Sequence, residues 1–167
     1  EVFHKVHLYA VSILRCLNSP HVLSPDVTSK CHDDQCQEMT CAFREYNWFK
    51  DGKVDKTKVT AHFNQLAKDK PEWKAVIDYV IPNCVARDLP AQGVHLNCPA
   101  YDILQCALTS FIQRSQSSQW TTSPECLPSR EYAGACPVCP GDCFAPAIPN
   151  GSCNACYGKP VPVAPAA

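Results

Sequence analysis

Thirteen cysteines in 167 residues constrain what this chain can fold into more than any other feature. A reduced cytosolic chain would need several metal ions to use so many thiols, so disulfides formed in an oxidising compartment are expected. Because thirteen is odd, at most six bridges can form within one chain and one thiol is left over. The chain has no Met at residue 1 and no charged-then-apolar leader, so we expect a secreted, extracellular protein whose signal peptide has been removed.

Five of the cysteines lie within residues 136–156, CPVCPGDCFAPAIPNGSCNAC. This segment contains two CxxC pairs separated by thirteen residues, which is close to the spacing of a zinc ribbon. The residues between the pairs are rich in Pro and include a fifth cysteine, and eight further cysteines stand upstream. The pattern therefore favours a disulfide knot over zinc, and no metal ion or other cofactor is expected. A glycosylation sequon at Asn150 agrees with secretion.

Charge and hydropathy argue against several classes of function. Fifteen basic and sixteen acidic residues give a net charge of -1 without a long run of either sign, so nucleic acid is not expected as a partner. No apolar run reaches the roughly 18 residues of a membrane span, so no membrane insertion is expected. The sequence also has no nucleophile elbow, no HExxH motif and no glycine-rich phosphate loop, so we do not expect an enzyme.

The spacing of apolar residues predicts six or seven helices. Apolar residues recur at helical spacing over residues 2–17, 36–49, 56–68, 71–81 and 98–115. Ser24 and Ser123 each precede a Pro, which is typical of a helix start, and Asp55 is expected to cap the helix after the turn KDGK. No stretch shows convincing period-2 alternation. We therefore predict an all-α fold whose helices are cross-linked by disulfides around an apolar cavity.

The composition of the chain changes after about residue 134. Pro, Gly, Ala and Cys dominate beyond this point, and the last eleven residues, YGKPVPVAPAA, are typical of an extended or disordered tail. We predict a helical domain over residues 1–134. An irregular Cys/Pro-rich C-terminal extension over residues 135–167 is expected to pack on the same domain.

Two segments resemble a known family. CAFREYNWFKDGKVDKTKV, from Cys41, is similar to the third and fourth helices of insect odorant-binding proteins, and the forty-two residues between Cys41 and Cys84 fit that family's third-to-fourth cysteine interval. CALTSFIQRSQSSQWTTSPECLPSREYAGACP, from Cys106, resembles the end of the Plus-C subclass. The resemblance covers roughly residues 1–136. One departure is that four residues separate Cys36 from Cys41, where the family usually has three.

A second departure concerns the last family cysteines. If Cys106 is the fifth, the position of the sixth is occupied by Ser115. The family's fourth-to-sixth bridge then cannot form as usual, and Cys84 is expected to pair with Cys98 or with a cysteine of the extension. An alternative alignment takes Cys98 and Cys106 as the last two cysteines of the family pattern, and the interval between them is then one residue shorter than in the family.

The resemblance implies an olfactory transport function, an extracellular carrier that binds odorants, pheromones or lipids in an internal apolar pocket. A membrane receptor is an implied partner, and the chain is expected to be a monomer or a homodimer. Burial of apolar ligand surface would contribute about 25 cal/mol per Å². The hydroxyls of Tyr46 and Tyr101 are candidates to orient the ligand. The predicted lining comprises these two tyrosines and eight apolar residues: Phe63, Val76, Ile77, Val80, Leu104, Leu108, Phe111 and Ile112.

Two alternatives belong to other functional classes. One is a secreted cysteine-rich protease inhibitor or defence protein that acts through the C-terminal extension. The other is a zinc-binding interaction module, which free thiols and bound metal in the native protein would distinguish.

Overall fold

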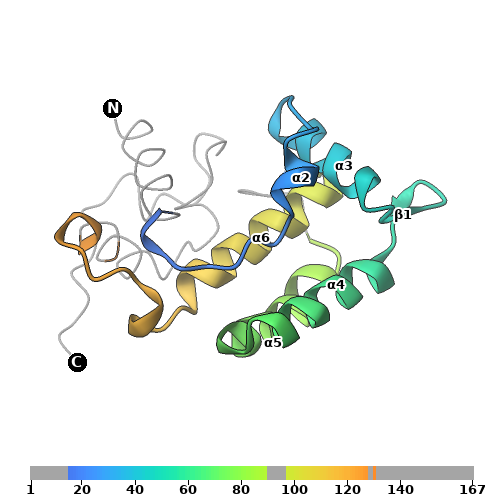
Figure 1. Ribbon diagram of the computed structural model, residues 1–167. Helices are drawn as coiled ribbons and strands as arrows, with labels where there is room; N and C mark the ends of the chain where they lie inside the picture. Colours follow the sequence, from blue (N-terminus) through green and yellow to red (C-terminus); the bar gives the residue numbers. More distant parts are fainter. Residues whose placement is uncertain (1–14, 90–96, 128–129, 131–167) are drawn as a thin grey trace, which may run out of the picture. The chain divides into compact units, whose positions relative to one another are not determined.

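The computed structural model describes residues 15–89 and 97–127, together with Arg130. Figure 1 shows these residues in colour. They belong to two compact units. The first unit contains residues 15–19 and the described residues from 108 onward. The second unit contains residues 20–89 and 97–107. The predicted C-terminal extension and most of the predicted helix 2–17 lie outside the described residues.

The described residues are mostly helical. The five α-helices are α2 Pro25–Thr28, α3 Gln35–Glu45, α4 Lys56–Asp69, α5 Lys74–Val80 and α6 Pro99–Gln113. Three 3-10 turns and one π turn complete the helical elements: η1 Pro71–Trp73, η2 Ile81–Val85, η3 Ser117–Gln119 and η4 Pro124–Cys126.

Three of the α-helices begin at residues whose side chains satisfy free backbone donors. Ser24 Oγ accepts a hydrogen bond from the backbone N–H of Asp26 at the start of α2. The carboxylates of Asp34 and Asp55 cap α3 and α4 in the same way, as Asp, Ser and Thr side chains commonly do. The predicted starts at Ser24 and Asp55 are therefore confirmed.

The predicted helix 36–49 ends earlier than expected, and a short hairpin follows it. Asn47 has a φ of 57°, which takes the chain out of the helical path after α3. The strands β1 (Phe49–Lys50) and β2 (Lys53–Val54) then pair antiparallel, with Phe49 opposite Val54. Asp51 and Gly52, with φ of 52° and 75°, make the two-residue turn, a pair of left-handed residues that tight hairpins favour. The expectation of no strand is thus wrong at this point.

The described residues contain five α-helices, fewer than the six or seven expected, because most of the predicted helix 2–17 lies outside the described residues and one predicted start gives no α-helix. The chain from Pro71 enters α5 through a 3-10 turn and leaves it through the π turn η2. Pro82 has no N–H to donate to the carbonyl four residues earlier, so the α-helical hydrogen bonding cannot continue. The predicted start at Ser123 produces only the three-residue turn η4.

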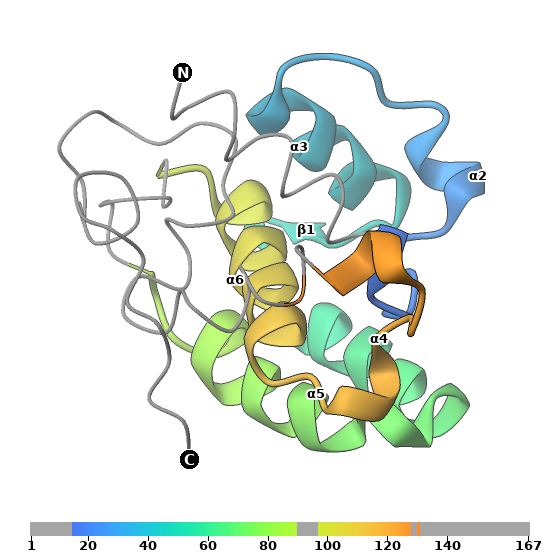
Figure 2. The same ribbon diagram turned by 90° about the vertical axis from the view of Figure 1, so that its left-hand side faces the viewer.

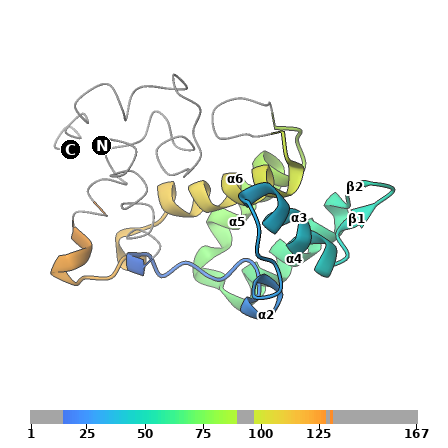
Figure 3. The same ribbon diagram turned by 90° about the horizontal axis from the view of Figure 1, so that it is seen from above.

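The core of the second unit is formed by apolar faces of α3, α4 and α5 with the turns beside them. Helices α4 and α5 pack against each other and lie side by side in Figures 2 and 3. On α4, buried positions recur every four residues, which is the spacing of one helical face. The fully buried side chains of this core include Phe43, Val59, Phe63, Trp73, Ile77, Val80 and Val85.

Helix α6 is covered on all sides over almost its whole length. Only Pro99, at its first position, is exposed. The buried residues are not all apolar, because Asp102, Gln105, Thr109 and Ser110 are also shielded from solvent. None of the helices in the described ranges is both long and apolar enough to cross a membrane.

Backbone pairing and one disulfide connect the described residues of the first unit. Leu17 forms an isolated antiparallel bridge with Trp120, flanked by hydrogen bonds from Asn18 N to Gln119 O and from Thr121 N to Cys16 O. The Cys16–Cys126 disulfide closes this arrangement. The unit therefore joins two segments that are about a hundred residues apart in the sequence.

Candidate functional site

All eight cysteines of the described residues form disulfides. The Cys16–Cys126 bridge belongs to the first unit. The six cysteines of the second unit pair first to third, second to fifth and fourth to sixth, as Cys31–Cys41, Cys36–Cys98 and Cys84–Cys106. Cys36–Cys98 fastens α3 to the residue before α6, and Cys84–Cys106 fastens η2 to the middle of α6. The five remaining cysteines of the chain, from Cys136 to Cys156, lie outside the described residues.

The partner of Cys84 differs from the expectation. Cys84 pairs with Cys106 and not with Cys98 or a cysteine of the extension. Cys106 lies on α6 beside η2, where its Sγ is 4.0 Å from the carbonyl oxygen of Asn83. Cys98 precedes α6 and is already bonded to Cys36 at the start of α3. In the alternative alignment Cys98 and Cys106 are the fifth and sixth cysteines of the family pattern. The bridge between Cys84, the fourth, and Cys106 agrees with that alignment.

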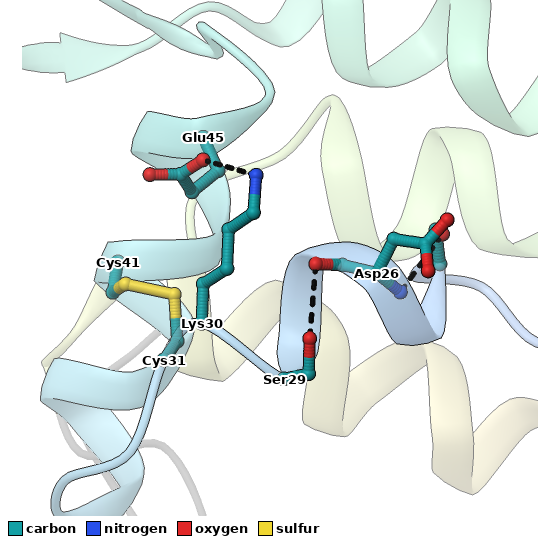
Figure 4. Close-up of polar contacts among 7 residues, drawn as sticks. Asp26, Ser29, Lys30, Cys31, Cys41 and Glu45 are labelled. Carbon is teal, nitrogen blue, oxygen red and sulfur yellow. Dashed lines mark hydrogen bonds and ion pairs between the residues drawn. A yellow bond between two sulfur atoms is a disulfide. The ribbon is translucent and has the colours of Figure 1, made fainter.

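The Cys31–Cys41 bridge fixes the approach of the chain to α3 (Figure 4). Beside it, Lys30 Nζ lies 3.6 Å from a carboxylate oxygen of Glu45, at the other end of α3. Both of these charged side chains are largely exposed, so the ion pair contributes little to stability. The disulfide is the stronger restraint on this segment.

The first turn of α6 is rigidly built. The backbone N–H of Cys98 donates to Asp102 Oδ2 at 3.0 Å, and the N–H of Asp102 donates to the Cys98 carbonyl at 2.8 Å. Asn97 adopts a φ of 56°, a conformation that Asn tolerates better than most residues. Together with the disulfide at Cys98, these contacts hold the residues that follow in one orientation.

Tyr101 lies within this turn and has an unusual environment. Its side chain is only 5% exposed, and among the described residues its hydroxyl has no hydrogen-bond partner. Leaving a buried hydroxyl unpaired costs about 1–3 kcal/mol. Burial, with a further contribution from the charge of Asp102, raises the pKa of Tyr101 to about 12. At neutral pH the residue is therefore a protonated phenol that can donate a hydrogen bond to a molecule that reaches it.

Tyr46, the other tyrosine that we expected to orient a ligand, has protein partners. Its Oη accepts a hydrogen bond of 2.7 Å from the backbone N–H of Ser24. Its ring stacks on Trp48 with a centroid distance of 4.3 Å and meets the edge of the His62 ring at 5.3 Å. The His62 ring in turn is hydrogen-bonded through Nε2 to the carbonyl oxygen of Val22 at 2.6 Å. Tyr46 therefore stabilises the fold through its ring and its hydroxyl, and its contact with a ligand stays a prediction.

The eight apolar residues of the predicted lining are shielded to different degrees. Phe63, Val76, Ile77 and Val80 are buried in the core of the second unit, and Leu104 of the same unit is half-buried. Leu108, Phe111 and Ile112 belong to the first unit, where the last two are buried. Their arrangement around one pocket stays a prediction.

The buried polar residues of α6 were not predicted from the sequence. We noted the apolar stripe of this helix, but Asp102, Gln105 and Thr109 recur at spacings of three and four residues and so share another face. Asp102 is 4% exposed and lies next to the tyrosine that we had selected. A polar stripe on a helix that is otherwise apolar was the signal that could have identified them.

No group of three or more His, Cys, Asp or Glu residues is placed to hold a metal ion in residues 15–89 and 97–127. Comparison with known proteins gave no match, whether with family models, with curated proteins or with solved structures.

Proposed function

We propose that this chain is a secreted carrier of small hydrophobic molecules, and that the hydroxyl of Tyr101 contacts the bound molecule. The observation that carries the proposal is the buried phenol without a partner among the described residues. A phenol in such a position is stabilised when a ligand supplies the missing hydrogen bond. The residue also occupies the first turn of α6, whose geometry the Cys36–Cys98 disulfide and the Asp102 carboxylate restrain.

The disulfide framework supports the same proposal. Three crossed bridges hold helices of the second unit in place, so that an apolar interior does not depend on close packing alone. Each bridge contributes about 2–4 kcal/mol, mainly by restricting the unfolded chain. A helical domain reinforced in this way can tolerate a space that would otherwise be costly.

The pairing of Cys84 with Cys106 also supports the resemblance to odorant-binding proteins. With Cys98 and Cys106 taken as the last pair, this bridge joins the fourth and sixth family cysteines. Binding would be physical and not catalytic, since a ligand that buries about 200 Å² of apolar surface gains about 5 kcal/mol. The freedom that the ligand loses on binding offsets part of this gain.

The test is equilibrium binding of N-phenyl-1-naphthylamine, a fluorescent apolar probe, to the oxidised full-length chain. We expect saturable binding of one probe per chain in the micromolar range, and loss of binding after the disulfides are reduced. Native mass spectrometry of the same sample gives the stoichiometry independently. Failure of the oxidised chain to bind the probe or any apolar molecule of about ten to sixteen carbons would overturn the proposal.

A further inference from the structure

We infer that the hairpin formed by β1 and β2 is a docking element for an acidic helix of another protein, and that Lys50 and Lys53 bind two carboxylates of that helix. This inference goes beyond the proposed carrier function and is independent of it, because neither lysine is among the proposed ligand contacts. The placement of the two lysines, their lack of partners and the charge around them support it.

The two lysines stand directly opposite each other on the exposed face of the hairpin. Lys50 pairs with Lys53 in the register of the strands, and both side chains are exposed. The neighbouring pair, Phe49 and Val54, is half-buried, as expected when successive side chains alternate between the faces of a strand. Opposite residues of an antiparallel pair have their Cβ atoms about 5 Å apart, and like charges at such positions are destabilising. The fold therefore retains an unfavourable pair of charges here.

Neither ammonium group is neutralised within the described part of the chain. No hydrogen bond or ion pair joins the side chain of Lys50 or Lys53 to another described residue. Asp88 is bonded to Lys56 at 2.9 Å, and this contact is the main cause that lowers the pKa of Asp88, with only a minor contribution from the charge of Lys53. Asp51, in the turn between the two lysines, is exposed and forms no ion pair with either. Both lysines are thus available to an external anion.

Further positive charge surrounds the hairpin. The guanidinium carbon of Arg44, an exposed residue, lies 6.0 Å from the ring centroid of Phe49, on the face opposite the two lysines. At the base of the hairpin, Lys58 Nζ donates to the carbonyl oxygen of Asn47. The whole chain, by contrast, has a net charge of -1. An acidic partner is therefore attracted to this part of a chain that is otherwise almost neutral.

Protection of the sheet edge is the other common role of such lysines, since charged side chains keep exposed strands from pairing with further chains. Each strand here has only two residues, and an edge so short offers few backbone groups to a second chain. The left-handed residues Asp51 and Gly52 fix the turn, and the hairpin projects from the helices of the second unit (Figures 1 and 3). Presentation of the two lysines to a partner therefore explains the pair better than protection does.

The spacing of the lysines selects the kind of partner. Residues three or four apart on a helix have their Cβ atoms about 5–6 Å apart. This matches the separation of about 5 Å across the lysine pair, so two ion pairs can form together. Anionic membranes are recognised by clusters of about four to eight cations, more than this face carries. A continuous row of phosphates would meet the carboxylate of Asp51 between the lysines.

The experiment is a titration of the ¹⁵N-labelled, oxidised full-length protein with two synthetic helical peptides of identical composition. In one peptide the Glu residues stand four apart on one face, and in the other no two Glu residues are three or four apart. We expect saturable binding of the first peptide, about fivefold tighter than that of the second, with the largest amide shift changes in residues 49–54. In about 1 M sodium chloride, where charges are screened beyond about 3 Å, this binding should be lost.

A pair of variants assigns the binding to the hairpin. Lys50→Gln/Lys53→Gln should lower the affinity for the first peptide about fivefold. It should also raise the urea concentration at the midpoint of unfolding, because the repulsion between the two charges is removed. Lys68→Gln/Lys70→Gln is the matched control, since it removes two exposed lysines at the end of α4 and should bind as the wild type does.

Each contrary outcome overturns the inference. If the wild type binds neither peptide, or binds both equally, the hairpin does not recognise an acidic helix. Equal losses of affinity in the two double variants would show that only the net charge matters. Tighter binding to vesicles of phosphatidylserine and phosphatidylcholine than to the first peptide would identify a membrane as the partner instead. The carrier function is tested separately by N-phenyl-1-naphthylamine, whose binding the hairpin variant should leave unchanged.

Discussion

The surroundings of Tyr46 and Tyr101 differ in whether the shielded polar groups have hydrogen-bond partners within the protein. Around Tyr46, the phenol, the backbone N–H of Ser24, the His62 ring and the carbonyl of Val22 are joined by short hydrogen bonds. Around Tyr101, the backbone groups of the helix start are paired, but the phenol has no partner among the described residues. Both residues looked equivalent in the sequence, as tyrosines near apolar helix faces.

This difference distinguishes a tyrosine whose hydroxyl supports the fold from one whose hydroxyl has no partner among the described residues. Stacked rings and hydrogen bonds to backbone groups make the half-buried Tyr46 region self-contained. The start of α6 is also restrained, by the Cys36–Cys98 disulfide, but the Tyr101 hydroxyl that it holds has no partner among the described residues. A hydroxyl that the fold does not need is one whose removal leaves the fold intact.

The largest expected effect comes from the disulfides that support the two regions. In the chain-entropy account, a bridge that spans 62 residues, as Cys36–Cys98 does, contributes about 4 kcal/mol, and one that spans 10, as Cys31–Cys41 does, about 3 kcal/mol. The double variant Cys36→Ala/Cys98→Ala should therefore lose more free energy of unfolding than Cys31→Ala/Cys41→Ala. Guanidinium denaturation without reductant measures both. The reverse order would show that the short bridge in α3 is the more important one.

A smaller effect is expected at alkaline pH. The pKa of Tyr101 is about 12 in the folded protein, against an ordinary value of 10.0, so below pH 10 the phenol is protonated in both states. Between pH 10 and 12 the unfolded chain loses this proton more readily than the folded one, and the free energy of unfolding falls. The loss is at most about 3 kcal/mol, at about 1.4 kcal/mol for each pKa unit.

The measurement is the difference in unfolding free energy between the wild type and Tyr101→Phe across this pH range. Other tyrosines contribute equally to both proteins and cancel. We expect the wild type to lose stability relative to the variant as the pH rises through 12. If the free energy of unfolding changed with pH in the same way in both proteins, the Tyr101 hydroxyl would be in contact with water or a polar partner in solution.

The smallest effect, and the most direct contrast, is between the two hydroxyls at neutral pH. Tyr46→Phe removes the acceptor of the Ser24 N–H and should lower the free energy of unfolding by about 1 kcal/mol. Tyr101→Phe removes an unpaired buried hydroxyl and should raise it by about 1 kcal/mol in the ligand-free protein. Thermal unfolding by calorimetry resolves changes of this size. Equal losses in both variants would abolish the distinction on which the proposed site depends.

Local features of the fold could be predicted from the sequence. The helix expected over residues 56–68 is α4, Lys56–Asp69, because an Asp cap, an apolar face and an Asp-Gly turn all act within a few residues of one another. The end of α3 could not be located, since Asn adopts the left-handed conformation more readily than most residues but does not always do so, and the residue type alone does not reveal it. The apolar run across Trp48 and Phe49 therefore looked like a continuing helix.

Features that depend on distant segments were predicted less well. The partner of Cys84 is set by which face of α6 lies against η2, and cysteine spacing along the chain left two alignments open, of which only one agrees with this bridge. The sequence likewise could not separate Tyr46 from Tyr101, whose roles differ because Ser24 reaches one hydroxyl and no described residue reaches the other. Residue types suggested two candidate tyrosines, and only the three-dimensional arrangement distinguishes their surroundings.

The hairpin between β1 and β2 projects from the helices, as Figures 1 and 3 show, and its turn at Asp51 and Gly52 is exposed. An exposed loop tip of this kind is a preferred site of proteolytic cleavage. A cut between these residues would leave two fragments, but the Cys36–Cys98 and Cys16–Cys126 bridges both connect residues on opposite sides of the cut. A nicked molecule would therefore migrate as one covalent species until it is reduced, so an intact band without reductant is no proof of an intact chain.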